Sequence, residues 1–282
     1  MHYVKEHTSI PVSDILIFDP DWDRKVGGET MVLTPRLWRS LTDDQWETLC
    51  TSVADIWSQL LRLRFKFIGS IYEQTEESEN RYFIGPMAYL PQAGTLASPE
   101  ASTSGPFSSS REWLVAVSNG KLSPTRRIPL DFDYEHKWRE TTIDVVKKSP
   151  LLDSEFLDHE QIVLSHIDYS LHNILVVRED PTRVIAVIDW EGARTVPMWA
   201  ANPTFRWPFL LSKAKVSHLQ QIIRKRIASQ IPGWEFATGD GYDTLHLLQR
   251  RAECSDADPS VYDTGEPIQH IMSWIDARCM AF

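Results

Sequence analysis

Three polar side chains between residues 168 and 189 have the chemistry that phosphate transfer requires. Asp168 and Asn173 belong to a polar stretch that follows the apolar residues 163–164, and Asp189 follows the apolar run 184–188. Transfer of a phosphoryl group to a hydroxyl needs a carboxylate that orients the hydroxyl and takes its proton. It also needs oxygen ligands that hold Mg²⁺ against the phosphates. Asp168, Asn173 and Asp189 match these needs.

The surrounding pattern predicts how these side chains come together. Two apolar runs, 174–177 and 184–188, enclose the polar turn 178–182, which is typical of a β-hairpin. We therefore expect residues 166–173 to form a loop, the hairpin to follow it, and Asp189 to end the second strand. This arrangement would bring the three polar side chains to one place.

Other segments have helical or strand patterns. Thr42 precedes two aspartates and an apolar pattern with helical spacing, so a helix capped by Thr42 is expected to run to Leu61. The apolar runs in 15–34 predict a second hairpin. The stretch 74–124 is rich in Ser, Gly, Pro and Glu, which predicts a surface insertion. Further helices are predicted at 112–117, 134–148, 216–229, 242–251 and 267–278.

Five segments together suggest a family. They are Thr8-Ser9-Ile10-Pro11-Val12, Ile68-Gly69-Ser70-Ile71-Tyr72, Gly105-Pro106-Phe107, the loop 166–173, and Ile188-Asp189-Trp190-Glu191-Gly192-Ala193. Through these segments the chain resembles the aminoglycoside phosphotransferase and choline-kinase-like family, particularly its fungal members. The likeness covers nearly the whole chain.

The resemblance implies an α+β, protein-kinase-like fold with a mainly helical C-lobe that contains the catalytic-loop hairpin. Residues 1–36 are then expected to be the remnant of a truncated N-lobe, and residues 37–282 to be the C-lobe with a surface insertion around 74–124. In the family, a Gly-rich phosphate loop and a phosphate-binding Lys precede the segment that corresponds to 8–12. Most of the nucleotide-binding lobe is therefore expected to be missing from this chain.

The resemblance also implies roles for the loop residues. Asp168 would be the catalytic base, Asn173 and Asp189 would bind the cofactor as Mg²⁺ ligands, and His166 would support the loop. Ile167 departs from the family, whose members usually have Gly between the His and the Asp. The candidates for the substrate pocket are His172, Trp190, Glu191 and Trp207.

Three hypotheses of function follow. In the first, which the expected loss of the nucleotide-binding lobe favours, the loop performs acid–base chemistry on a small metabolite without any cofactor. Asp168 would be the base and His166 or His172 its proton partner, and the reaction would be a cyclisation, isomerisation, elimination or hydrolysis. In the second, the chain is an ATP- and Mg²⁺-dependent phosphotransferase that acts on a hydroxylated small molecule. In the third, it binds a ligand without catalysis.

The same loop contains a metal-ligand set of another kind. His166, Asp168 and His172 supply two imidazoles and one carboxylate, the ligands of non-haem iron sites. All three lie within seven residues of one another, however, and the resemblance already accounts for His166 and Asp168. The iron site is therefore the less favoured interpretation.

Composition limits the partners and the compartment. The net charge of −10 gives no general electrostatic reason to bind nucleic acid or an anionic membrane. Three scattered cysteines favour a reducing compartment, and the cytoplasm is the expected location. We expect a small-molecule substrate. We also expect the exposed hairpin 15–34 to be covered, either in a homodimer or by the insertion.

Overall fold

The computed structural model describes twelve segments and a few further residues. The segments are 1–12, 30–32, 40–74, 81–88, 105–118, 132–149, 152, 161–177, 179–190, 192–201, 211–238 and 245–246, and the further residues are 248, 249 and 252. The chain divides into two compact units. Unit 1 comprises 1–63, 166–191 and 203–235, and unit 2 comprises 64–165, 192–202 and 236–282.

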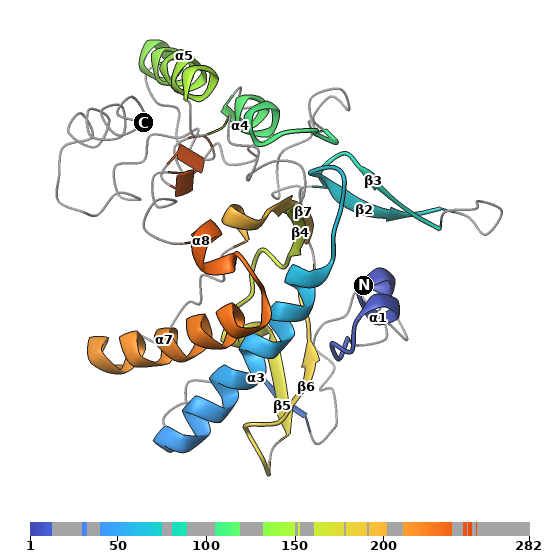
Figure 1. Ribbon diagram of the computed structural model, residues 1–282, viewed down its shortest axis with the longest axis vertical. Helices are drawn as coiled ribbons and strands as arrows, with labels where there is room; N and C mark the ends of the chain where they lie inside the picture. Colours follow the sequence, from blue (N-terminus) through green and yellow to red (C-terminus); the bar gives the residue numbers. More distant parts are fainter. Residues whose placement is uncertain are drawn as a thin grey trace. The chain divides into compact units, whose positions relative to one another are not determined.

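Unit 1 contains a small sheet and two long helices (Figure 1). Its elements are α1 (His2–His7), β1 (Thr30–Val32), α3 (Asp43–Arg62), the 3₁₀ helix η3 (Leu171–Asn173), β5 (Ile174–Val177), β6 (Val184–Val187) and α7 (Lys213–Gln230). The sheet is antiparallel with strand order β1-β5-β6, so β5 lies in the middle. Val12 adds a parallel bridge to Val187 at the end of β6.

Helix α3 begins where the sequence predicts it. The Thr42 side chain accepts a hydrogen bond from the Gln45 amide (3.3 Å), and the Gln45 side chain accepts one from the Thr42 amide (2.9 Å). This reciprocal capping box satisfies two of the donors that a helix start leaves unpaired. The apolar residues of α3, including Trp46, Leu49 and Val53, are buried. The predicted cap and helix are therefore confirmed.

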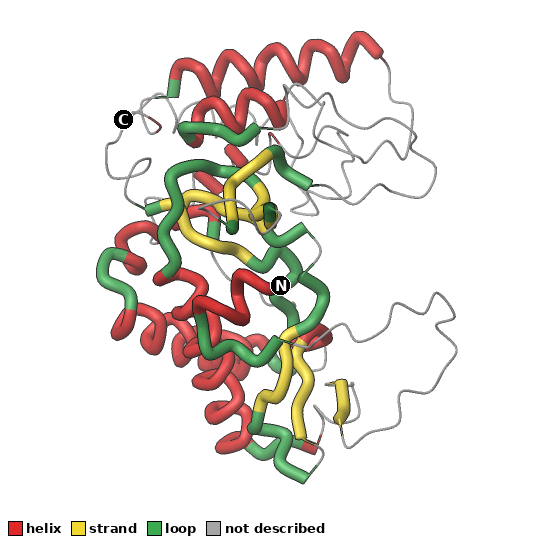
Figure 2. The backbone as a smooth tube through the Cα atoms, turned by 90° about the vertical axis from the view of Figure 1, so that its right-hand side faces the viewer, coloured by secondary structure: helices red, strands yellow, loops and turns green. Residues whose placement is uncertain are grey.

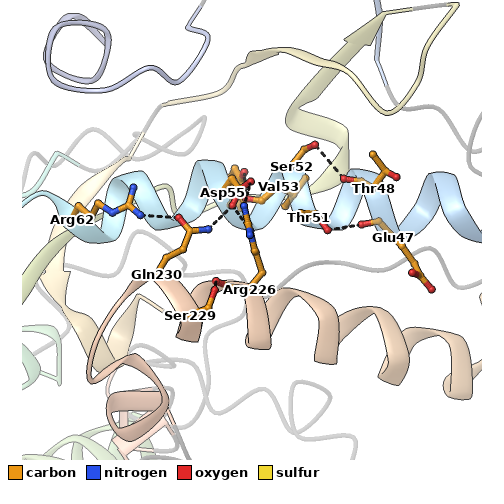
Figure 3. A network of polar contacts seen from close by, with 11 residues as sticks. Glu47, Thr48, Thr51, Ser52, Val53, Asp55, Arg62, Arg226, Ser229 and Gln230 are labelled. Carbon is orange, nitrogen blue, oxygen red and sulfur yellow. Dashed lines mark hydrogen bonds and ion pairs between the residues drawn. The ribbon is translucent and has the colours of Figure 1, made fainter.

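Charged side chains join α3 to α7 (Figure 3). The Arg226 guanidinium donates to both carboxylate oxygens of Asp55, at 2.7 and 3.0 Å, and Gln230 donates to the same carboxylate. These donors, of which Arg226 has the largest effect, hold the pKa of Asp55 below its usual range. Arg62 completes the network with a 2.7 Å bond to the Gln230 side-chain oxygen. The polar network thus holds the solvent-facing side of this helix pair.

Among its described residues, unit 2 contains two antiparallel strand pairs and two longer helices. Strand β2 (Ser70–Glu73) pairs with β3 (Tyr82–Gly85), and β4 (Ile162–Ser165) pairs with β7 (Arg194–Pro197). The remaining elements are α4 (Ser110–Ser118), α5 (Phe132–Lys148) and η4 (Met198–Ala200). Figure 2 shows all the described strands in yellow. Helix α8 (Trp234–Thr238) begins in unit 1 and ends in unit 2.

Buried tryptophans form much of the core of unit 2. Trp113 of α4 and Trp199 of η4 lie with ring centroids 6.1 Å apart, and both are almost fully buried. The Trp199 indole N–H donates to the Ser110 hydroxyl at 3.3 Å. Arg111 donates to the carbonyls of Val146 and Lys147 at the end of α5 and to that of Ser149 just beyond it, which satisfies acceptors that the helix end leaves open.

Most predicted elements that fall on described residues are present. The helices at 112–117, 134–148 and 216–229 are confirmed by α4, α5 and α7, and helices with small antiparallel sheets agree with an α+β fold. In the stretch predicted as a surface insertion, β3 forms the second strand of a hairpin with β2.

Other predictions fall outside the described residues. Strand β1 pairs with β5, whereas its predicted partner at 15–19 lies outside the described part of the chain, as does the predicted helix at 267–278. The boundary between residues 36 and 37 also lies there and stays a prediction. No helix among the described residues is long and apolar enough to span a membrane.

Candidate functional site

The loop between β4 and η3 begins with a tight turn. The Tyr169 amide donates to the His166 carbonyl at 3.1 Å, which closes a turn whose two central residues are Ile167 and Asp168. Both central side chains are exposed, whereas His166 and Tyr169 at the corners are 1% and 3% exposed. The corners therefore anchor the turn, and its apex presents a carboxylate and an apolar side chain to solvent.

Tyr169 anchors the turn to helix α3. Its hydroxyl donates to the Val53 carbonyl at 3.1 Å, and its ring lies 4.7 Å from the Trp57 ring. Complete burial raises the pKa of Tyr169 well above its usual value, so the phenol stays protonated and remains a donor. The sequence pattern assigned Tyr169 no role, although its place directly after Asp168 could have indicated an anchor.

Asn173 joins the two carboxylates of the site. Its amide nitrogen Nδ2 donates to the Asp168 backbone carbonyl at 2.8 Å and lies 3.1 Å from Asp168 Oδ2 and 3.4 Å from Asp189 Oδ2. Both carboxylate oxygens are thus close to a single nitrogen atom. The structure brings Asp168, Asn173 and Asp189 together, as the sequence pattern predicted, although Asp189 comes two residues after the end of β6 rather than ending that strand.

The backbone around β6 fixes the position of Asp189. The Val187 amide donates to the Pro11 carbonyl at 2.8 Å, and the Ile188 amide donates to the Asn173 carbonyl at 3.0 Å. Asp189 itself adopts a left-handed conformation with φ of 64°, which Asp tolerates better than most residues do. This conformation turns the chain directly after the hairpin, and the Asp189 carboxylate is exposed beside Asn173.

Burial favours the neutral form of His166, although the hydrogen bond of its ring to the Ile188 carbonyl favours the charged form. Its Nε2 donates to the Ile188 carbonyl at 2.9 Å, and its ring packs edge-on at 4.6 Å from Trp190. Its other nitrogen, Nδ1, is buried and has no hydrogen-bond partner among the described residues. Burial is the main reason why the pKa of His166 is lowered. The imidazole therefore ties the loop to the residue before Asp189.

The remaining candidates are placed differently. His172 is exposed on η3, and Trp190 is buried with its indole N–H donating to the Val187 carbonyl at 2.8 Å, which is a packing arrangement. Glu191 and Trp207 lie outside the described residues. Within the described part of the chain, no group of three or more His, Cys, Asp or Glu side chains could hold a metal ion, so the iron-site alternative gains no support.

The donor set still fits a magnesium ion, because Mg²⁺ needs few protein ligands when phosphate oxygens supply others. The Asn173 amide is oriented by the Asp168 carbonyl, and no described residue donates a hydrogen bond to its oxygen Oδ1. Asn173 Oδ1 and the Asp189 carboxylate are therefore available as hard oxygen ligands. The Asp168 carboxylate lies close enough to Asn173 to add negative charge to the same site.

One comparison with known proteins gives a match. A model of the phosphotransferase enzyme family matches residues 105–200, a segment that contains Asp168, Asn173 and Asp189. The match confirms the predicted resemblance to an aminoglycoside phosphotransferase-like family over this segment. No curated protein and no solved structure matches the chain. The fungal type and the truncated N-lobe stay predictions.

Proposed function

We propose that this chain is a phosphotransferase that moves a phosphoryl group from Mg²⁺-bound ATP to a hydroxyl of a small molecule. The observation that supports this most is the Asn173 amide, which lies within 3.4 Å of carboxylate oxygens from both Asp168 and Asp189. A divalent cation bound beside Asn173 would neutralise the charge of these two acidic groups. The family match over 105–200 supports the same class of enzyme.

Each of the three residues has a distinct part in the proposed reaction. Asp168 is exposed at the apex of its turn, where an acceptor hydroxyl can reach it, and it would orient that hydroxyl and take its proton. Asn173 and Asp189 would hold Mg²⁺, which would supply neutralisation of the phosphate charge. His166 and Tyr169 would hold the three side chains in position.

The cofactor-free acid–base hypothesis receives less support from the geometry. That hypothesis needs an imidazole as the proton partner of Asp168, and one of its two candidates was His166. The His166 Nε2 proton is already donated to the Ile188 carbonyl, and its Nδ1 atom is buried. His172 remains exposed, but a dyad of Asp168 and His172 would leave Asn173 and Asp189 without a chemical role.

A binding experiment separates the hypotheses. We would titrate ATP into the chain by calorimetry with Mg²⁺ and with EDTA, using wild type, Asp189→Asn and the matched control Glu179→Gln. Glu179 is an exposed acid in the β5–β6 turn, so its variant loses the same charge within the same hairpin. We expect Mg²⁺-dependent binding in wild type and in the control, and its loss in Asp189→Asn. Equal binding with and without Mg²⁺ in all three would refute the proposal.

A second arm tests catalysis without knowledge of the acceptor. Slow hydrolysis of ATP uses water as the acceptor, so its rate can be measured in Asp168→Asn. Loss of a general base typically lowers a rate by about 10²- to 10⁴-fold, while nucleotide binding should persist. Binding of MgATP with a hydrolysis rate that is zero in wild type would instead favour the non-catalytic hypothesis.

A further inference from the structure

The apex of the catalytic turn carries an apolar side chain beside the proposed base. Ile167 is 47% exposed, more than the three other exposed large hydrophobic residues of the described part of the chain, which are 40–43% exposed. It precedes Asp168 directly, and the two are the central residues of the turn that Tyr169 closes onto His166. An isoleucine exposed to this extent gains only part of the burial free energy that a core isoleucine gains.

The turn has little freedom to move Ile167 away from Asp168. The Tyr169 hydroxyl is bonded to α3 at Val53, and the His166 ring is bonded to the Ile188 carbonyl. A further bond, from the Ser170 amide to the Asp168 carbonyl at 2.8 Å, fixes the second half of the turn. Both apex side chains are therefore held on one rigid protrusion, with adjacent Cα atoms about 3.8 Å apart.

We propose that Ile167 is a specificity-determining residue, which contacts an apolar part of the acceptor next to the hydroxyl that Asp168 orients. This inference rests on the proposed phosphotransferase function and names the acceptor class as an alcohol with an apolar group close to its reactive hydroxyl. Because Ile167 and Asp168 are consecutive exposed residues of one turn, an acceptor that binds at Asp168 would lie close to Ile167. A fully hydrated, purely polar acceptor would gain nothing from Ile167, whereas an alkyl or aryl group would remove apolar surface from water.

The test uses a homologous series of 1,2-alkanediols, from ethanediol to hexanediol, as probes. Their dissociation constants would be measured on the full chain with Mg²⁺ and ADP present, from the shift of the ¹³C-labelled Ile167 δ1 methyl signal. Variants at residue 167 lack this signal. For them, each diol's dissociation constant would be measured by its competition with ¹⁹F-labelled hexanediol, the longest diol of the series. A buried methylene strengthens binding by about fourfold and a half-buried one by about twofold, so affinity should rise about two- to fourfold for each added carbon.

Three variants make the result specific. Ile167→Ser should abolish the dependence on chain length, while Ile167→Val should keep most of it. Phe83→Ser is the matched control, because Phe83 of β3 is another exposed apolar residue, at 42%. It should leave the dependence unchanged. Loss of the dependence in Ile167→Ser alone supports the proposal. The same dependence in wild type and Ile167→Ser, or none in wild type, overturns it.

The outcome is distinguishable from failure of the proposed function. The calorimetric titration of MgATP tests the phosphotransferase proposal without any acceptor, whereas the diol series tests the surface at Ile167. If the chain binds MgATP but its affinity for the diols does not change with their chain length, only the role of Ile167 is refuted. A chain-length effect that depends on Ile167 in a chain that binds no MgATP would leave an apolar contact site at the apex but refute its link to phosphate transfer.

Discussion

Acid titration of unfolding tests directly how His166 is held. In the structure, the His166 ring donates its Nε2 proton to the Ile188 carbonyl. Its Nδ1 atom is buried and has no hydrogen-bond partner in the described part of the chain. Protonation would add a charge and an unpaired N–H in a place that is 1% exposed. Asp168 and Asp189 favour the charged form, but burial outweighs them, and the pKa of His166 is lowered in the folded chain.

The sign and size of the effect follow from proton linkage. In the unfolded chain, His166 binds a proton as the pH falls through about 6.5, whereas the folded chain binds it only at lower pH. The contribution to stability is therefore complete above the unfolded pKa and is lost as the pH falls toward the folded pKa. The slope is at most about 1.4 kcal/mol per pH unit for one proton. Between about pH 6.5 and 5.5, the loss is therefore at most about 1 kcal/mol.

The assay is urea unfolding followed by tryptophan fluorescence at about pH 7.5, 6.5 and 5.5, in EDTA. His166→Gln keeps a donor for the Ile188 carbonyl but cannot be protonated, so its stability should fall less on acidification than that of wild type. His172→Gln is the matched control, since His172 is exposed on the same loop and should behave as wild type does. Identical pH dependence in wild type and His166→Gln would refute the reasoning. So would greater stability of wild type at low pH, which would indicate a charged His166 paired with Asp168.

Substitutions at three further positions test local features of the fold. Thr42→Ala should lower the free energy of unfolding by about 1 kcal/mol because the capping box of α3 is lost, and Thr42→Asp should not, as measured by urea unfolding. Tyr169→Phe should cost about 1 kcal/mol through the lost bond to Val53, and it should lower the rate of ATP hydrolysis without weakening MgATP binding. Gly69→Ala should cost roughly 1–3 kcal/mol or more, because the new Cβ would overlap the Gly85 carbonyl oxygen. An unfolding midpoint equal to that of wild type would contradict the close approach of the chain at Gly69 and Gly85.

Local signals in the sequence identified the helices well. The start of α3 could be predicted because Thr42 precedes two aspartates and an apolar pattern with helical spacing, and α5 and α7 have apolar residues at helical intervals. The pairing of β1 with β5 could not be predicted in this way. Strands of three or four residues are too short for a periodic pattern, and their partners lie far along the chain.

The sequence predicted which residues form the candidate site, but not how His166 and Tyr169 are protonated and hydrogen-bonded. The pattern from Asp168 to Asp189 placed three polar residues around one loop and hairpin, and the structure brings them together at Asn173. The state of His166 depends on burial against Trp190 and on a bond to a carbonyl 22 residues away, which the sequence does not reveal. The anchoring of Tyr169 on α3 is equally a product of tertiary packing.

The discontinuity of unit 1 affects how the protein is made. Residues 1–63 belong with residues 166–191 and 203–235, so α3 must wait for these later segments before its apolar face is covered. At a synthesis rate of about 5–20 residues per second, the wait is roughly 5 to 20 seconds for the loop that begins at residue 166 and longer for α7. During that time the ribosome carries an exposed amphipathic helix. Helix α3 therefore reaches its native packing only after residues 166–191 and 203–235 have been made, and the candidate site assembles no earlier than that.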